Sequence, residues 1–139
     1  MTLVGNRQRA LVAEAARTAD PTAPFTDVAM HFWRWLTSEP GLGSMRLAFE
    51  ACSLAMRRPE SFGEHASRLV TEWVDLCREA LVAEGHDRKS ASAHATIVTA
   101  TFTGLLLDLL VTKDERRVKA AANAYLASLT ELERPAVKI

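Results

Sequence analysis

Histidine is the side chain best suited to metal binding and proton transfer near neutral pH. The chain has four of them, His31, His65, His86 and His94. Two histidines on one helix share a metal ion when they lie three or four residues apart, and none of these four has a partner at that spacing. The sequence therefore predicts no metal site and no cofactor.

Motifs of common catalytic mechanisms are also missing from the sequence. There is no GxSxG nucleophile turn, no HExxH zinc motif, no glycine-rich phosphate loop and no CxxC pair. An enzyme needs acid–base or nucleophilic groups that converge on one pocket, and no such set stands out. We expect the chain not to be an enzyme, with a small helical enzyme as a rival interpretation.

A few polar side chains interrupt the most apolar part of the chain. Asp108 lies within the run 105–111, and we expect it to face solvent or to bond a neighbouring helix, with a ligand contact as the alternative. Thr99, Thr101 and Thr103 are expected to bond backbone carbonyls one turn earlier. The alternative for these threonines is the polar lining of a pocket.

Composition and charge narrow the class of protein. The chain has 139 residues, of which 48% are hydrophobic, and it carries 17 basic and 17 acidic side chains. These values predict one globular domain, 1–139, without the basic excess that DNA binding needs. Cys52 and Cys77 lie among apolar residues, which favours reduced, buried thiols over a disulfide or a metal site.

The location of the protein is predicted from two segments. Residues 95–112 approach the length of a membrane span, but they include Asp108 and several threonines, which favours a buried helix in a soluble protein. Residues 1–7 lack the basic start of a signal peptide, and no long apolar run follows them. We expect a cytoplasmic protein without a membrane partner.

Proline, glycine and capping residues divide the chain into about six helices with no strand, which predicts an all-α fold. The expected helices cover residues 3–18, about 26–39, 45–57, 59–84, 87–111 and 114–132. Pro40 and Gly41 are expected to end the second helix, and Gly85 the fourth. The expected N-caps are Thr22 or Thr26, Ser44, Asp87 and, in a capping box with Glu115, Thr112.

The predicted helices differ in how much apolar surface they carry. The fourth has one stripe: Phe62, Ala66, Leu69, Val70, Trp73, Cys77, Ala80 and Leu81. The last is expected to bury Val118, Ala121, Ala122, Tyr125, Leu129 and Leu132. The second and fifth are apolar on several sides, which predicts burial all round and either a cavity or a partner chain.

A mostly apolar pocket among the second to fifth helices would account for the extra apolar surface of the second and fifth helices. Its candidate lining is Phe32, Trp33, Phe49, Cys52, Met56, Trp73, Cys77, Thr101 and Phe102. Aromatic, Met and Cys side chains adapt to varied ligands, and His94 is one of the few polar groups nearby that could orient one. A well-filled core would show the same pattern, so both interpretations stay open.

The stretch from about Glu79 to Leu129 resembles the C-terminal half of TetR-type transcriptional regulators. The segments that carry this resemblance are Ala80–Gly85, Ala91–Ala95, Thr103–Leu107, the break at Lys113–Asp114 and the alanine-rich helix that ends in Tyr125–Leu126. The resemblance implies an effector-sensing and dimerisation domain of a repressor. Residues 1–18 would then be the connector helix that follows a DNA-binding domain, and that domain is absent from this sequence.

In that family the last two helices pair with their symmetry mates in a four-helix bundle, and the earlier helices enclose a ligand. We therefore expect a homodimer that binds a small hydrophobic effector and does not bind DNA by itself. The spacing of Ala100 and Gly104 favours a close approach of two helices. The expected interface residues are Ile97, Ala100, Gly104, Asp108, Val118, Ala122 and Tyr125. A carrier of lipids or other hydrophobes and a protein-interaction adaptor are the alternatives.

Overall fold

A computed structural model describes residues 24–131. All the regular elements of this part of the chain are helices, with no strand among them, which confirms the predicted all-α class. The elements are α2 (Phe25–Leu36), α3 (Glu39–Arg57), α4 (Pro59–Ala83), α5 (Arg88–Thr112), α6 (Glu115–Ser128) and a 3₁₀ turn, η1 (Leu129–Glu131). The expected helix 3–18, the Thr22 cap and the burial of Leu132 lie outside the described residues.

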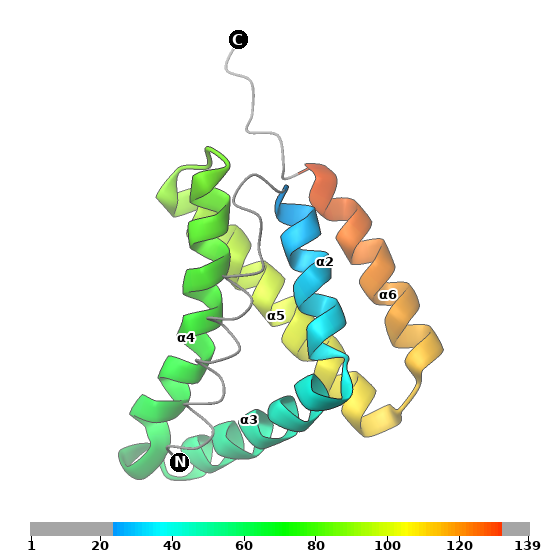
Figure 1. The fold of residues 1–139 in the computed structure, drawn as a ribbon. Helices are drawn as coiled ribbons and strands as arrows, with labels where there is room; N and C mark the ends of the chain where they lie inside the picture. Colours follow the sequence, from blue (N-terminus) through cyan, green and yellow to red (C-terminus); the bar gives the residue numbers. More distant parts are fainter. Residues whose placement is uncertain (1–23, 132–139) are drawn as a thin grey trace.

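The long helix α5 is the centre of the arrangement (Figure 1). It packs along α4 and α6 and also contacts α3, while α2 lies against α3 and α6. The side chains at the core of this packing are fully buried: Phe25, Leu81, Val98, Leu106, Val118 and Leu129. Because they come from α2, α4, α5, α6 and η1, a single core holds these elements together.

The boundary between α2 and α3 corrects the expected caps. α2 ends at Leu36, and Ser38 is the N-cap of α3, where its hydroxyl accepts a hydrogen bond from the Gly41 N–H (3.3 Å). Pro40 belongs to the first turn of α3, where a missing N–H costs nothing. Ser44, the expected cap, is buried one turn later inside α3.

Gly41 lies where α3 starts against the end of α2. A Cβ atom at this position would come within 2.1 Å of the Trp35 carbonyl oxygen and 2.8 Å of the Leu36 carbonyl oxygen. Only a residue without a side chain fits so close to a neighbouring backbone. Gly41 is therefore the residue that lets the two helices meet in a short turn.

The expected end of α4 and start of α5 are both confirmed. Gly85 has a φ of 106°, its N–H bonds the Val82 carbonyl, and the His86 N–H bonds the Leu81 carbonyl, which together form a Schellman motif. Asp87 then caps α5 by accepting a hydrogen bond from the Ser90 N–H (2.9 Å).

The turn from α5 to α6 differs from the expected capping box. Asp114 is the N-cap of α6 and accepts from the Arg117 N–H (3.2 Å), while the Thr112 hydroxyl accepts from the Asp114 N–H rather than from Glu115. Lys113 closes α5 with a φ of 59°, the left-handed region that glycine usually occupies. Its side chain therefore stands where the backbone alone would favour glycine.

The N-terminus of α2 is capped by a residue that is distant in the sequence. Pro24 stands at the N-cap position and supplies no side-chain hydrogen bond, and Thr26, the expected cap, lies inside the first turn. The backbone N–H of Phe25 instead donates to the carboxylate of Glu84 at the end of α4. A carboxylate at a helix N-terminus also suits the positive end of the helix dipole.

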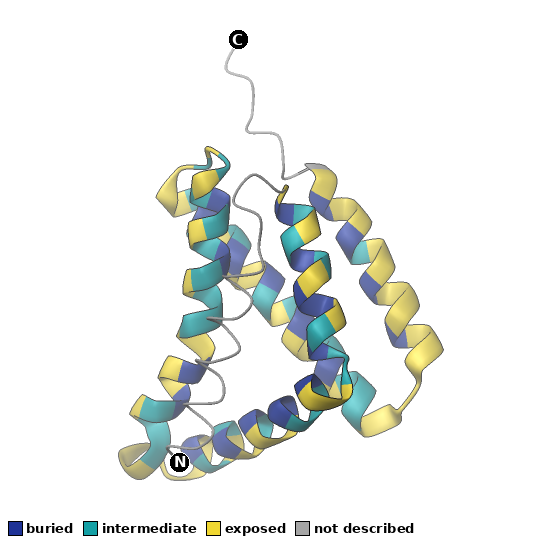
Figure 2. Ribbon diagram, viewed as in Figure 1, coloured by how far each residue is buried: buried dark blue, intermediate teal, exposed yellow. Residues whose placement is uncertain are grey.

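Burial follows the expected stripes with four exceptions (Figure 2). Val70 of α4 is 53% exposed, and Ala121 of α6 is exposed although it was expected in the core. The third exception is α5, which buries one face through Ala91, Ala95, Val98, Phe102 and Leu106 and leaves the opposite face exposed. The prediction of burial all round is therefore wrong for α5. The fourth exception is α2, which leaves Asp27, His31 and Arg34 exposed on one face, so the same prediction is wrong for this helix.

Helix α5 also has the length and composition of a membrane-crossing helix, and it is the one helix of the described part that does. Core helices of soluble proteins share both properties, although only 22% of its most apolar window is buried inside this fold.

Candidate functional site

The side chains that line the predicted apolar pocket fill nearly all of its space. Phe32, Trp73, Cys77 and Phe102 do come together, around a cavity of about 40 Å³. The rings of Phe32 and Trp73 meet edge to face with their centroids 5.3 Å apart. A space of this size accommodates about one water molecule, far below the several hundred Å³ of ligand pockets. The predicted pocket is therefore a packed part of the core.

The other residues predicted for that pocket lie elsewhere. Met56 is 79% exposed, and Phe49 and Cys52 are half-buried on α3 without lining the cavity. The hydroxyl of Thr101 donates to the Ile97 carbonyl (2.8 Å), and Thr99 bonds the Ala95 carbonyl in the same way, as predicted. Thr99 and Thr103 also line the small cavity, which is the alternative given for these threonines, and Thr103 is an exposed residue.

Both cysteines are free, as the sequence predicts. Burial raises the pKa of the Cys77 thiol to about 12, and it also raises the pKa of Cys52. A thiol with a raised pKa is a poor nucleophile. Neither cysteine is therefore suited to catalysis. Across residues 24–131 no group of three metal-binding side chains assembles, and His86 and His94 lie with ring centroids 6.3 Å apart.

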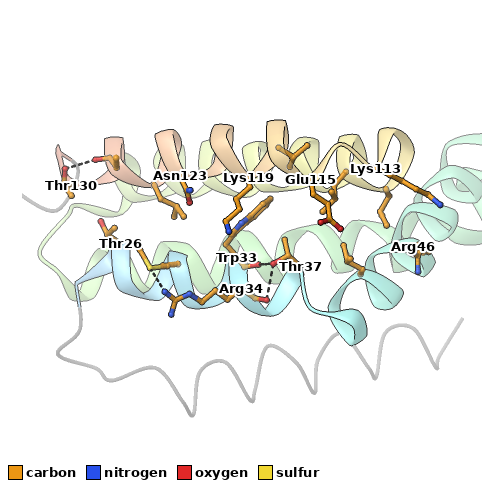
Figure 3. A pocket seen from close by; sticks show the side chains of 17 residues that line it. Thr26, Trp33, Arg34, Thr37, Arg46, Lys113, Glu115, Lys119, Asn123 and Thr130 are labelled. Atoms are coloured by element: carbon orange, nitrogen blue, oxygen red, sulfur yellow. Dashed lines mark hydrogen bonds between the residues drawn. The ribbon is translucent and has the colours of Figure 1, made fainter.

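A much larger hollow than the cavity of about 40 Å³ lies on another side of the fold, between α2 and α6 (Figure 3). This groove has a volume of about 930 Å³. Its floor is apolar and includes Trp33, Val118 and Leu126, which are all buried, together with half-buried Met30 and Leu109. Of the residues predicted to line a pocket, only Trp33 belongs to the groove.

Polar and charged side chains form the rim of the groove. Arg34, Arg46, Lys113 and Lys119 are cationic, and Glu115 is the one acidic residue of the lining. The uncharged polar residues of the rim are Thr26, Thr37, Asn123 and Thr130. In Figure 3, Thr130 and Asn123 lie toward one end of the groove and Lys113 and Arg46 toward the other. The groove is therefore amphipathic: its charged side chains, Glu115 among them, lie from the middle of the groove to the Arg46 end, and the other end has uncharged polar groups.

The exposed face of α5 is a second candidate surface. Six small or apolar residues, called here the α5 stripe, lie on the side opposite the core: Ala93, Ile97, Ala100, Gly104, Leu107 and Val111. They alternate at spacings of four and three residues, the pattern of a helix seam that packs against another helix. A Cβ atom at Gly104 would meet nothing within 4 Å, so the centre of the stripe is open.

The expected dimer residues divide between this stripe and the core. Ile97, Ala100 and Gly104 lie on the stripe, where they are exposed. Val118 and Ala122 are at most 1% exposed, so they belong to the core of the single chain and have no surface left for a partner. The Tyr125 ring packs against Phe102 with centroids 6.0 Å apart.

Asp108 bonds a neighbouring helix, the interpretation that the sequence favours. Arg117 of α6 donates to both of its carboxylate oxygens (2.5 and 2.9 Å), and the Thr112 hydroxyl bonds it at 2.9 Å. These hydrogen bonds hold the pKa of Asp108 below its ordinary value, with the bond from Arg117 as the largest cause. The cluster ties the end of α5 to the start of α6 beside the α5 stripe.

This lowered pKa gives a prediction for acid stability. A carboxylate whose pKa is lower in the folded chain stabilises the fold above its ordinary pKa of 3.8, and this contribution disappears as the pH falls through the lowered value. Asp108→Asn should therefore lower the melting temperature at neutral pH, and the difference from wild type should shrink in acid. Thermal unfolding across a pH series measures this.

The matched control is Asp75→Asn, which removes an exposed ion pair within α4 (2.9 Å to Arg78). This variant should differ little from wild type, because Asp75 pairs only within its own helix and Arg78 keeps Glu79 as a partner (3.5 Å), whereas Asp108 joins two helices through three side-chain hydrogen bonds. A constant difference between Asp108→Asn and wild type at every pH would contradict the prediction.

Comparison with known proteins adds no identification. No family model, no curated protein and no solved structure matches the chain.

Proposed function

We propose that this chain is the dimerisation and effector-binding domain of a TetR-like transcriptional regulator. The observation that carries the proposal is the α5 stripe, a row of apolar and small side chains on the exposed face of the longest apolar helix. Contiguous apolar surface of this kind marks an interaction site. Its place on the penultimate helix is where the sequence resemblance leads us to expect a dimer contact.

The stripe is suited to contact with a second copy of itself. Its middle holds two small residues, Ala100 and Gly104, and its larger side chains, Ile97 and Leu107, stand on either side. Two α5 helices related by a twofold axis would cross at the small residues, with the larger side chains filling the space beside the crossing. Arg117 and Asp108 flank the stripe and already neutralise each other, so a second copy meets no unpaired charge there.

Sedimentation velocity over a range of micromolar concentrations tests this proposal. We expect a species of about twice the chain mass of 15.3 kDa. Gly104→Leu should raise the dimer dissociation constant at least about tenfold, equivalent to 1.4 kcal/mol, because the added side chain separates the two helices. It should leave the folded monomer intact, since the position is open.

Gly43→Leu is the matched control. Gly43 is also a helical glycine with nothing within 4 Å of an added Cβ, but it lies on α3, away from the stripe. This variant should dimerise as the wild type does. A monomer at all concentrations, or unchanged dimerisation of Gly104→Leu, would contradict the proposal. A monomer that instead pellets with lipid vesicles would assign the stripe to a membrane surface.

A further inference from the structure

We propose that the groove between α2 and α6 binds an amphipathic anion of the fatty-acid class. The alkyl chain would lie on the apolar floor and the carboxylate at the cationic end. This inference names the effector class of the domain proposed above, but it depends on a different surface from the α5 stripe. The groove also takes the place of the apolar pocket predicted from the sequence, because the cavity of about 40 Å³ found there is too small for an effector.

The charge of the groove is the first argument. Four basic side chains and one acidic side chain line it, whereas the whole chain carries equal numbers of acids and bases. In the part of the chain that the structure describes, the ion pairs use Arg78, Arg88 and Arg117, and none uses a basic residue of the groove. Unneutralised cations that share a concave surface attract an anion.

The floor is the second argument, because it excludes a purely polar anion as the best ligand. The apolar side chains of the lining that keep surface in contact with water are the half-buried ones: Met30, Leu42, Leu109 and Leu110. The Arg34 guanidinium rests on the Met30 sulfur (3.4 Å) rather than on a carboxylate. An alkyl chain would cover this apolar surface, which inorganic phosphate or acetate would leave in water.

The ends of the groove supply the orientation. Figure 3 shows Lys113 and Arg46 toward one end, with Glu115 between Lys113 and Lys119. Arg34 lies near the middle, and the opposite end has the uncharged Asn123 and Thr130. A ligand with one charged end therefore has one favoured direction. The groove volume of about 930 Å³ lies within the range of small-molecule sites.

The backbone at Lys113 agrees with this assignment. Its left-handed φ of 59° would be unstrained for glycine, and strained backbone concentrates at ligand sites, where the side chain is needed. Lys113 thus places a cation at the mouth of the groove at a conformational cost that glycine would avoid.

Isothermal titration of the full chain with dodecanoate, below the concentration of micelle formation, tests the proposal. We expect saturable binding of dodecanoate and at least about tenfold weaker binding of dodecanol, which has the same chain without the charge. Acetate and inorganic phosphate should show no saturable binding. Equal affinity for dodecanoate and dodecanol, or tight binding of phosphate alone, would overturn the assignment.

The double variant Lys113→Gln/Lys119→Gln locates the site. It should weaken dodecanoate at least about tenfold and leave dodecanol unchanged, because only the charge contact is lost. Lys89→Gln is the matched control, since this exposed lysine at the start of α5 lies outside the groove. Unchanged dodecanoate affinity of the double variant would overturn the proposal. Sedimentation velocity of the same samples measures dimerisation independently of ligand binding. The proposed dimer and the proposed ligand site can therefore be contradicted separately.

Discussion

Leu106→Ala is expected to lower the free energy of unfolding by roughly 3–5 kcal/mol, the upper range for truncation of a buried leucine. The Leu106 side chain is 0% exposed and belongs to the central core, beside the small cavity that Phe32 and Phe102 also line. Truncation would enlarge that cavity, and the surrounding rings cannot collapse into the space without leaving their own contacts. Urea denaturation of wild type and variant at equal concentration measures the loss.

Leu107→Ala is the matched control, because it makes the same change on the next residue of the same helix. Leu107 is 48% exposed and lies on the α5 stripe. The free energy of unfolding should fall by less than about 1 kcal/mol, which is usual for substitutions at exposed positions. The affinity of the dimer should also fall. Similar unfolding costs for both leucines would contradict the described orientation of α5.

Gly41→Ala should destabilise the fold by at least about 2–3 kcal/mol, although alanine is normally the better helix former. The added methyl group would collide with the backbone carbonyls of Trp35 and Leu36, and backbone cannot rotate aside as a side chain can. The end of α2 would have to separate from the start of α3. Thermal or chemical unfolding measures the change.

Gly43→Ala provides the contrast within the same helix. Its Cβ would meet nothing within 4 Å, so the substitution should stabilise the fold by about 0.5–1 kcal/mol through helix propensity alone. If Gly41→Ala were as stable as Gly43→Ala, the close contact between α2 and α3 would be wrong.

The sequence predicts the parts of this fold that depend on local chemistry. Gly85 and Asp87 end one helix and start the next as expected, because a left-handed glycine and a capping carboxylate act within a few residues. The boundary at residues 37–41 differs from the prediction because Pro40 and Gly41, which are typical of a helix end, here begin α3. The local signal was present, since Ser38 two residues before a proline is typical of a helix start.

The candidate sites were less predictable because they depend on which helices become neighbours. The aromatic residues of α2, α4 and α5 were recognised as one group, but a sequence does not show that Phe32 and Trp73 fill the space between them. The groove between α2 and α6 is not predictable from the sequence for the same reason. Its basic residues come from α2, α3 and the segment around α6, and each appears alone in the sequence as an ordinary solvated charge.

The bond from Phe25 to Glu84 has a consequence for how the chain folds during synthesis. The two residues are 59 positions apart, so α2 leaves the ribosome before its capping carboxylate exists. At roughly 5–20 residues per second, the delay is about 3–12 s. Throughout that interval the first turn of α2 lacks its acceptor, and its apolar side chains lack α4 and α5 as neighbours. The apolar side chains of α2 wait still longer, since Trp33 packs against Phe102 of α5. Recognition of nascent chains by chaperones would therefore concentrate on α2 and end only once α5 has emerged and docked.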